Sequence, residues 1–208
     1  MNRLEEILTE SIAYSDSKGD QKDFQALLEY AVRTPSVKEQ PPFLEIGTRG
    51  GGSALAILRI IEEFFHSSTT LVTVDPYGDK PYDGKPWKYG DKFYVQMKKT
   101  LSSYGNHIHY QMVSVEFINI MDTVHYWFRG KERNFTELSF VLLDGSHLPE
   151  TVMFEYNHLF PRLIKGGYMI IDNTNFYNKQ VQKHFRYINN KSREVINTKD
   201  QTIIKRLR

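Results

Sequence analysis

The sequence predicts an α/β fold in which a doubly wound, mostly parallel sheet is built from alternating strands and helices. Three observations predict it. Short aliphatic segments alternate with amphipathic ones, several aliphatic segments stop abruptly at acid or amide groups, and a glycine-rich turn follows the first of them. Alternating strands and helices imply parallel pairing with right-handed crossovers. The 208 residues are most simply one domain, long enough for a substantial core.

The amino-terminal part of the chain predicts a helical extension ahead of the sheet. Two amphipathic helices are expected over 3–14 and 21–33, and prolines then break the chain before the first strand at 43–46. We therefore divide the domain into residues 1–40, a helical extension and candidate lid, and residues 41–208, the catalytic core.

The middle of the chain continues the alternation. A helix over 53–65 has Leu55, Leu58, Ile61 and Phe65 on one face. The elements that follow are a strand at 71–74, a loop at 77–90, a helix at 91–103, a strand at 108–113 and a helix at 115–128.

The carboxyl-terminal part of the chain supplies the remaining strands. A strand at 138–143 precedes a helix at 149–160, and Gly166-Gly167 turns the chain into a strand at 168–171. After a helix near 178–189, strands at 193–197 and 201–206 form a closing hairpin. This hairpin adds an antiparallel carboxyl-terminal strand and brings the sheet to seven strands.

Composition and charge exclude several classes of protein. The chain has no cysteine, which excludes disulfides and thiolate metal sites. Its 27 basic and 25 acidic residues are scattered, so no basic face suggests nucleic acid as a partner. The charged amino terminus does not resemble a signal peptide, and no apolar stretch is long enough to cross a membrane. A cytoplasmic protein with no membrane partner follows by default.

Acid and amide side chains follow two of the predicted strands. Asp144 ends the strand at 138–143, and Asp172 and Asn173 end the strand at 168–171. Ligands bind at the carboxyl ends of parallel strands, where these hard oxygen donors would suit a divalent cation such as Mg²⁺. The alternative is structural: Asp144 caps a helix and Asp172-Asn173 forms a turn.

A cofactor site is predicted where the first strand meets its helix. The segment Glu45-Ile-Gly47-Thr-Arg-Gly-Gly51-Gly-Ser53 lets a ligand approach the backbone near free N–H groups. Glu45 would repel a pyrophosphate and suits a positively charged ligand such as the amino group of an amino acid. Asp75, which ends the next strand, is placed to hydrogen-bond ribose hydroxyls. The alternative is a loop whose glycines only allow tight packing.

His147 is the candidate catalytic base, because it lies three residues beyond Asp144 and histidine is a side chain that commonly accepts and donates protons at working pH. A loop histidine bound to backbone is the alternative. The other six histidines are expected to be structural. A substrate wall is expected over 77–94, where six aromatic residues could stack on an acceptor or form a small satellite core: Tyr77, Tyr82, Trp87, Tyr89, Phe93 and Tyr94.

Residues 40–175 resemble class I S-adenosylmethionine-dependent methyltransferases, and most closely the metal-dependent O-methyltransferases. The segment from Glu45 to Ser53 looks like the first cofactor motif of catechol O-methyltransferase, whose metal ligands match Asp144, Asp172 and Asn173. The segment Asp144-Gly-Ser-His147 looks more like macrocin- and mycinamicin-type sugar O-methyltransferases, in which the histidine is the proposed base. The resemblance implies a Rossmann-like core.

The resemblance also implies roles for individual residues. S-adenosylmethionine would contact a set of residues at the ends of the strands: Glu45, Gly47, Thr48, Gly51, Ser53, Asp75, Ser114 and Asp144. Two departures matter. Catechol-type enzymes have a lysine base where this chain has His147, and the macrolide-sugar enzymes have an acidic pair where it has Asp172-Asn173.

The expected reaction is methylation of a small-molecule hydroxyl group. The cation would bind the hydroxyl, His147 would accept its proton, and Asp144 would hold the cation. Rival interpretations are an NAD(P)-dependent oxidoreductase, which Glu45 and Arg49 disfavour, a nucleic-acid methyltransferase, and a silent binding protein on the same fold. Relatives with this pattern commonly self-associate, so a homo-oligomer is an open alternative.

Overall fold

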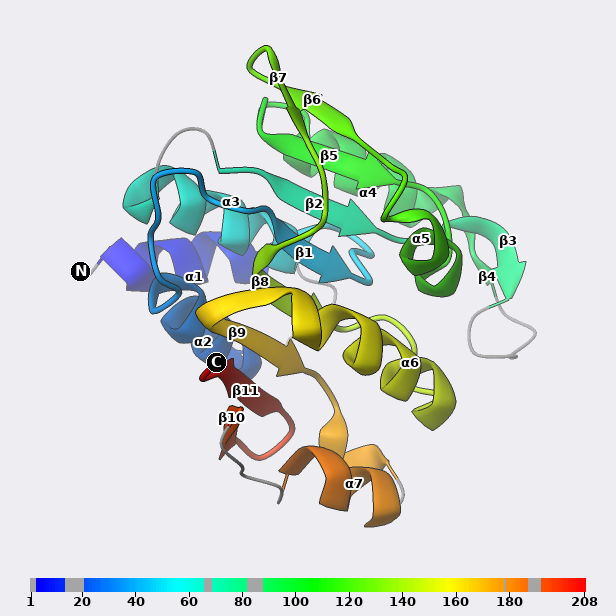
Figure 1. Ribbon diagram of the computed structural model, residues 1–208. Helices are drawn as coiled ribbons and strands as arrows, with labels where there is room; N and C mark the ends of the chain where they lie inside the picture. The colour runs from blue at the N-terminus through cyan, green and yellow to red at the C-terminus, as the bar shows by residue number, and fades with distance from the viewer. Residues whose placement is uncertain (1–2, 14–20, 66–68, 82–87, 178, 187–191) are drawn as a thin grey trace.

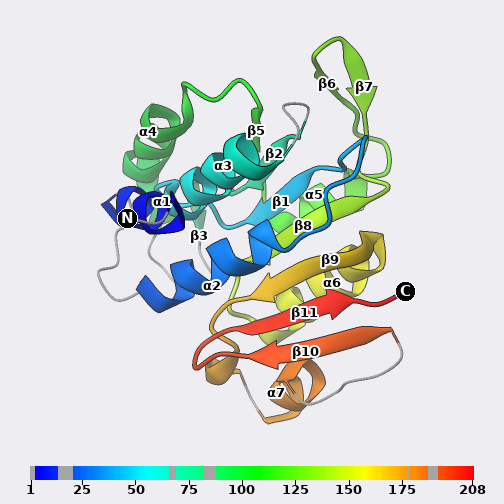
Figure 2. The same ribbon diagram turned by 90° about the vertical axis from the view of Figure 1, so that its left-hand side faces the viewer.

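The computed structural model describes residues 3–13, 21–65, 69–81, 88–177, 179–186 and 192–208. Its main sheet has seven strands in the order β10–β11–β9–β8–β1–β2–β5 (Figures 1 and 2). Their bounds are β1 (Phe43–Ile46), β2 (Leu71–Val74), β5 (His107–Tyr110), β8 (Leu138–Leu143), β9 (Leu163–Ile171), β10 (Arg193–Asn197) and β11 (Thr202–Arg206). Strand β11 runs antiparallel to both of its neighbours, and the other pairs are parallel. The predicted fold class is confirmed.

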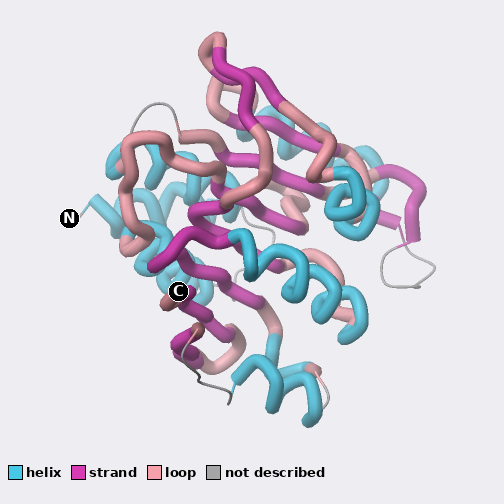
Figure 3. Tube along the Cα trace, in the orientation of Figure 1, coloured by secondary structure: helices cyan, strands magenta, loops and turns pink. Residues whose placement is uncertain are grey.

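Helices cover both faces of this sheet (Figures 2 and 3). One layer contains α1 (Arg3–Ala13), α2 (Gln21–Val32), α3 (Gly52–Phe64) and α4 (Gly90–Leu101), and the other contains α5 (Ser114–Ile120), α6 (Pro149–Leu159) and α7 (Lys179–Arg186). Consecutive strand residues alternate between the two cores: Phe43 and Phe140 belong to the first, Leu44 and Val141 to the second. No helix in the described ranges is long and apolar enough to cross a membrane.

The amino-terminal helices are part of the first layer. Helices α1 and α2 both pack against α3, and Ile7, Leu27 and Ala31 are buried in the core that they share. Tyr30 of α2 lies 5.3 Å from Tyr168 of β9, measured between ring centroids. The extension thus stabilises one face of the sheet, and its role as a lid stays a prediction.

The strand register brings the predicted site residues to one edge. The last paired residues of four neighbouring strands lie in a row: Val74, Ile46, Leu143 and Ile171. Each is followed directly by a candidate site residue: Asp75, Gly47, Asp144 and Asp172, respectively. The carboxyl edge of the sheet is therefore lined by three acids and a glycine.

The prediction of a loop over 77–90 is wrong in part. Strands β3 (Gly78–Pro81) and β4 (Lys88–Tyr89) form a small antiparallel pair there. Glycine and proline in this stretch predict turns. Strands β3 and β4 could not be predicted because they are too short to show a periodic pattern.

The prediction of a long helix over 115–128 is also wrong. Helix α5 ends at Ile120, and a hairpin of β6 (Tyr126–Phe128) and β7 (Lys131–Arg133) follows. Arg129 and Gly130 both have positive φ, at 50° and 73°, as a two-residue hairpin turn requires. The aromatic residues of β6 are compatible with a helix as well as with a strand, so the local sequence does not distinguish the two.

Gly166-Gly167 does not form a turn before a strand, because β9 is continuous from Leu163 to Ile171. Gly166 has φ of 83°, and the register with β8 shifts between Leu138 and Phe140. A Cβ on Gly167 would lie 2.7 Å from the carbonyl oxygen of Ser139. The two glycines thus allow an irregular, closely packed stretch inside the strand. Short 3₁₀ helices η1 (Phe160–Arg162) and η2 (Thr174–Phe176) flank β9.

Candidate active site

The turn between β1 and α3 requires glycine at two positions. Gly47 has φ of 90°, and a Cβ on it would lie 2.2 Å from the carbonyl oxygen of Asp144. Gly51 also has φ of 90°, and its N–H donates to the carbonyl of Thr48 at 2.8 Å. These conformations suit glycine, so the loop can fold against the end of β8 and leave the first N–H groups of α3 facing the carboxyl edge.

Glu45 is a buried carboxyl group with an unsatisfied oxygen. The Ser53 hydroxyl, at the start of α3, hydrogen-bonds to Glu45 Oε1, whereas buried Oε2 has no hydrogen-bond partner. Burial raises the pKa of Glu45 to about 8, the charge of Asp75 adds to this shift, and the hydroxyl groups of Ser53 and Thr48 oppose it. Buried polar atoms are normally satisfied, so Oε2 marks a position for a donor on a ligand.

Asp75 is almost fully buried and holds the glycine-rich turn in place. Its Oδ2 accepts the backbone N–H groups of Thr48 and Arg49, each at 3.0 Å, and its Oδ1 accepts the N–H of Tyr77 at 3.2 Å. Burial raises the pKa of Asp75, and the three backbone hydrogen bonds oppose that shift. This role in the loop was not predicted, and the ribose contact stays a prediction.

The ends of β8 and β9 bring three of the predicted catalytic and metal residues together. Asn173 Nδ2 lies 3.0 Å from His147 Nε2, and the same amide hydrogen-bonds to Asp172 Oδ2. Asn173 adopts a left-handed conformation, with φ of 54°, which asparagine tolerates better than most residues. Because an amide nitrogen only donates, Nε2 of His147 is the acceptor in this contact.

Asp144 follows Leu143 directly, and its N–H donates to the carbonyl of Ile46 at 2.9 Å. It does not cap α6, because the residue before that helix is Leu148. The capping alternative for Asp144 is therefore wrong. Asp144 and Asp172 follow Leu143 and Ile171, which face each other in the parallel ladder.

The structure does not show a formed metal site. Among the described residues, no three His, Cys, Asp or Glu side chains converge where a metal ion could bind. The amide nitrogen of Asn173 faces Asp172, although its oxygen would be the ligand. The donor set of two carboxylates and an amide still suits Mg²⁺ chemically, so the site stays a prediction.

The two predicted serines both lie at helix starts near the carboxyl edge. Ser53 is in the first turn of α3, and Ser114 is the first residue of α5, which follows β5. Ser114 is buried at this position. Its contact with adenine stays a prediction.

Gln201 is a site residue that the sequence analysis missed. It is buried just before β11, and its Nε2 donates to Asp172 Oδ1 at 2.9 Å. Asp172 thus accepts hydrogen bonds from two amides, Asn173 and Gln201. In the sequence, Gln201 is a polar residue next to the turn of the predicted hairpin. Such a residue can be part of a site or simply part of the turn, so its identity alone does not predict its role.

The predicted aromatic wall supports the cofactor loop where it is described. Buried Tyr77 donates from its hydroxyl to the carbonyl of Arg49 at 2.6 Å. The Arg49 guanidinium lies 5.0 Å from the centroid of the Phe93 ring. Tyr77 is buried and supports the turn, whereas contact of Phe93 with a substrate stays a prediction. Tyr82, Trp87 and the side chain of Tyr89 lie outside the described part of the chain.

Comparison with known proteins gives the family of this fold and site. Residues 44–174 match a family model described as a methyltransferase domain. The chain is similar over its whole length to three solved structures. A protein from Corynebacterium glutamicum has a TM-score of 0.63 at 14% identity, with 90% of that chain covered. The O-methyltransferase TomG from Streptomyces achromogenes, in complex with SAM, has a TM-score of 0.60 at 13% identity, with 90% covered.

The third is an O-methyltransferase from Bacillus cereus in complex with SAH, with a TM-score of 0.58 at 16% identity and 91% of that chain covered. At such identities the likeness to these three structures shows the fold. Among curated proteins, none matches the chain.

Proposed function

Because the chain belongs to the methyltransferase-domain family and is a class I S-adenosylmethionine-dependent methyltransferase, we propose that it methylates a hydroxyl group of a small molecule. The observation that carries this proposal is the carboxyl edge of the sheet, where the unsatisfied Glu45 oxygen, the glycine-rich turn and the His147–Asn173–Asp172 cluster are placed on neighbouring strands. Two structural neighbours are O-methyltransferases, which supports the choice of oxygen as the acceptor atom.

The cofactor residues follow from this arrangement. Glu45 Oε2 would accept a hydrogen bond from the amino group of the methionine moiety, and the turn from Gly47 to Gly51, with Thr48, would lie against the same end. Ser53 would contact the carboxylate, Asp75 the ribose, Ser114 the adenine, and Asp144 would face the reacting methyl group. Because Asp75 is 1% exposed, its contact with the ribose requires the Thr48–Arg49 segment to shift.

Proton transfer is assigned to His147. When bound, S-adenosylmethionine supplies a methyl group on a sulfonium centre. The chain must orient the acceptor hydroxyl in line with that methyl group and remove the hydroxyl proton as the new C–O bond forms. In the structure the Asn173 amide lies 3.0 Å from Nε2 of His147, so this amide must rotate away before Nε2 can accept the hydroxyl proton.

We also propose that Asp144, Asp172 and Asn173 hold a divalent cation when the acceptor binds. A bound Mg²⁺ would lower the pKa of the acceptor hydroxyl. Support comes from the two carboxylates, which follow paired residues at the ends of adjacent strands and are hard oxygen ligands of the kind that Mg²⁺ prefers. Rotation of the Asn173 amide would be needed, because its nitrogen faces Asp172 in the structure.

The test is a methyl-transfer assay with S-adenosylmethionine and a panel of hydroxylated sugars and phenols, followed by mass spectrometry of the product. We expect an increase of one methyl group on oxygen for at least one acceptor class. Removing divalent cations with a chelator, or the substitution Asp144→Ala, should abolish turnover while cofactor binding persists in part. Methylation of nitrogen or carbon alone would contradict the assignment of oxygen, and full activity in chelator would contradict the cation.

A further inference from the structure

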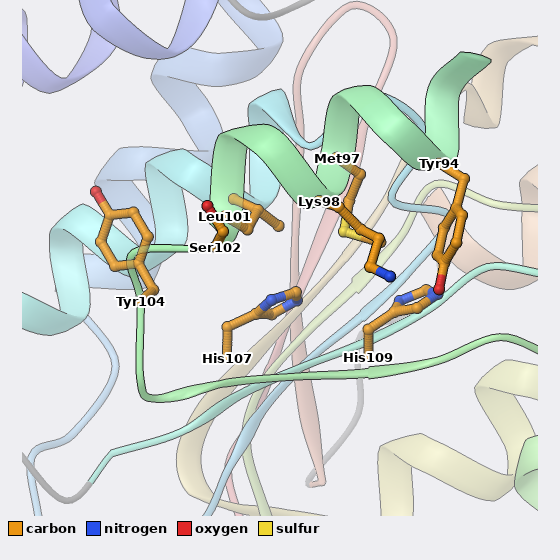
Figure 4. A pocket seen from close by; sticks show the side chains of 8 residues that line it. All are labelled: Tyr94, Met97, Lys98, Leu101, Ser102, Tyr104, His107 and His109. Carbon is orange, nitrogen blue, oxygen red and sulfur yellow. The ribbon is translucent and has the colours of Figure 1, made fainter. Parts of the chain in front are cut away.

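A pocket of about 380 Å³ lies between α4 and the edge strand β5, on the face of the sheet that α1–α4 cover. Figure 4 shows His107 and His109 projecting from β5 toward α4, and Lys98 extending from α4 into the same space. His107 is opposite Leu71, the first residue of β2, so the pocket begins at the end of the sheet away from the proposed active site.

The floor of the pocket contains a polar network that is incomplete. Thr73 Oγ1 lies 2.9 Å from both His107 Nε2 and His109 Nδ1. A hydroxyl donates one hydrogen bond, so the two neutral imidazoles must have complementary tautomers around it. Buried His109 Nε2 has no hydrogen-bond partner. A buried polar atom without a partner is unusual and marks a place where a ligand atom would be stabilised.

The remaining lining groups define the chemistry of the ligand. Met97 and Leu101 supply apolar contacts and Tyr94 and Tyr104 supply aromatic ones, while Lys98 supplies a positive charge. Its Nζ lies 4.8 Å from the centroid of the Tyr94 ring. No lining residue is acidic, and the volume is that of a small-molecule site. These groups suit a small aromatic anion.

Tyr94 and Lys98 also have the Tyr-x-x-x-Lys spacing of some hydride-transferring enzymes. They face this pocket and not the carboxyl edge of the strands, and the Lys98 ammonium lies over the Tyr94 ring. The pair therefore contributes to the pocket and gives no support to an oxidoreductase.

The pocket is connected to the cofactor loop by direct packing. The Tyr77 ring lies 5.3 Å from the His109 ring and 5.2 Å from the Tyr94 ring, and its hydroxyl bonds to the carbonyl of Arg49. On the other side of α4, the Gln96 side chain lies 2.7 Å from the position that a Cβ on Gly50 would occupy. Helix α4 thus lies between the pocket and the loop.

We propose that this pocket is a second binding site, for a small aromatic carboxylate, and that its occupancy weakens cofactor binding. The carboxylate would pair with Lys98 and accept a hydrogen bond from His109 Nε2 in the tautomer that has its proton there, and the ring would pack between Tyr94 and Met97. A ligand there would hold α4 and Tyr77 against the loop, whereas cofactor binding requires the Thr48–Arg49 segment to shift. The coupling rests on the proposed function, and the existence of the site does not.

Benzoate and its neutral analogue benzamide are suitable probes, titrated into the whole protein and followed by NMR of the histidine ring nitrogens. We expect saturable binding of benzoate with shifts at His107 and His109, and binding of benzamide at least about tenfold weaker. Lys98→Ala should remove that difference. Lys99→Ala, the neighbouring exposed lysine that does not line the pocket, should leave it unchanged. Equal affinity for both probes in the wild type, or no shift at these histidines, would overturn the site.

The coupling is tested by titrating S-adenosylhomocysteine in the absence and presence of saturating benzoate. We expect its dissociation constant to rise by about fivefold or more, and reciprocity requires the same factor for benzoate. An unchanged constant would overturn the coupling and leave the site standing. If S-adenosylhomocysteine does not bind at all, the proposed function fails, and the benzoate titration still decides the pocket.

Discussion

Glu45 is expected to bind the cofactor and also to make cofactor affinity depend on pH. Its carboxyl group is buried, one oxygen has no partner, and burial raises its pKa to about 8. At neutral pH the group is therefore largely protonated, and an ammonium placed beside it would favour the ionised form. Binding of a cationic amino group should release a proton from the protein.

The first prediction concerns that proton. At pH 7 we expect S-adenosylhomocysteine binding to release protons and its affinity to rise as the pH is raised toward 8. Titration calorimetry in buffers of different ionisation enthalpy measures both quantities. Glu45→Gln should bind more weakly and should lose the proton release that Glu45 contributes. Equal proton release in the variant and the wild type would show that another group titrates.

The second prediction concerns His147. If it accepts the hydroxyl proton, His147→Ala should lower kcat by about 100-fold or more, within the usual range for general base catalysis. The dissociation constant for S-adenosylhomocysteine should stay close to that of the wild type.

His158→Ala is the matched control for His147→Ala. His158 is exposed on α6, and its Nδ1 lies 2.8 Å from the carbonyl of Phe154 in its own helix. Its loss should leave kcat unchanged. A normal kcat in His147→Ala would remove the base from the mechanism.

At the scale of elements, the β1–α3 turn depends on one close approach. The backbone of Gly47 lies against the carbonyl of Asp144, so the turn fixes the distance between the cofactor loop and the end of β8. A side chain at this position would force the two segments apart.

The third prediction is that Gly47→Ala lowers the free energy of unfolding by about 2 kcal/mol or more, since overpacking and a positive φ both oppose the new Cβ. Cofactor affinity should fall with it. Gly78→Ala is the control, because Gly78 also has positive φ, at 64°, and a Cβ there would meet nothing within 4 Å. Urea denaturation of both variants separates the clash from the backbone strain, and equal losses would contradict the close approach.

The central strands could be predicted from the sequence because polar residues, glycine or proline mark where their apolar runs begin and end. The strands at 43–46, 71–74 and 138–143 have the predicted bounds, since each is a short apolar run that ends at a polar or breaking residue. The hairpin of β6 and β7 was missed because its three-residue strands are too short to show a sustained alternation of apolar and polar residues. Local sequence cannot distinguish such strands from the end of a helix.

The site was predictable where it depends on strand ends. Asp75, Asp144 and Asp172 follow buried strands, and parallel topology brings such ends to one edge. Gln201 was not predictable, because it reaches Asp172 across 29 residues through a hairpin turn. The hydrogen bonds from three backbone N–H groups to Asp75 could not be predicted either, because they depend on how the loop folds.

At the scale of the whole molecule, buried titratable groups oppose each other in setting stability. Burial lowers the pKa of His107 and His109 from 6.5 to about 4, so the unfolded chain binds protons there that the folded chain does not. Stability from these groups is lost as the pH falls below 6.5. Glu45 acts in the opposite sense: the folded chain keeps a proton that the unfolded chain releases above about 4.5, so stability falls as the pH rises toward 8.

The fourth prediction is a maximum in the free energy of unfolding near pH 6.5. Below pH 6.5 the loss of stability from protonation of His107 and His109 in the unfolded chain is larger than the gain from Glu45. Above pH 6.5 the decline in the free energy of unfolding comes from Glu45. Each proton that differs between the folded and unfolded chains contributes a slope of up to about 1.4 kcal/mol per pH unit. Burial also raises the pKa of Asp75 and lowers that of His184, and these two shifts oppose each other. Urea denaturation from pH 5 to about pH 8.5 measures the curve. Glu45→Gln should remove the decline above pH 6.5, and a decline that persists in that variant would contradict the assignment.

The most direct measurement is a pair of calorimetric titrations of the wild-type protein, one with S-adenosylhomocysteine and one with NAD⁺. The unsatisfied Glu45 oxygen, which can accept a hydrogen bond from an ammonium group and has no favourable contact to offer a pyrophosphate, predicts micromolar binding of S-adenosylhomocysteine and no measurable heat from NAD⁺. Tight binding of NAD⁺, or no binding of S-adenosylhomocysteine at any accessible concentration, would contradict a methyltransferase site at the carboxyl edge of this sheet.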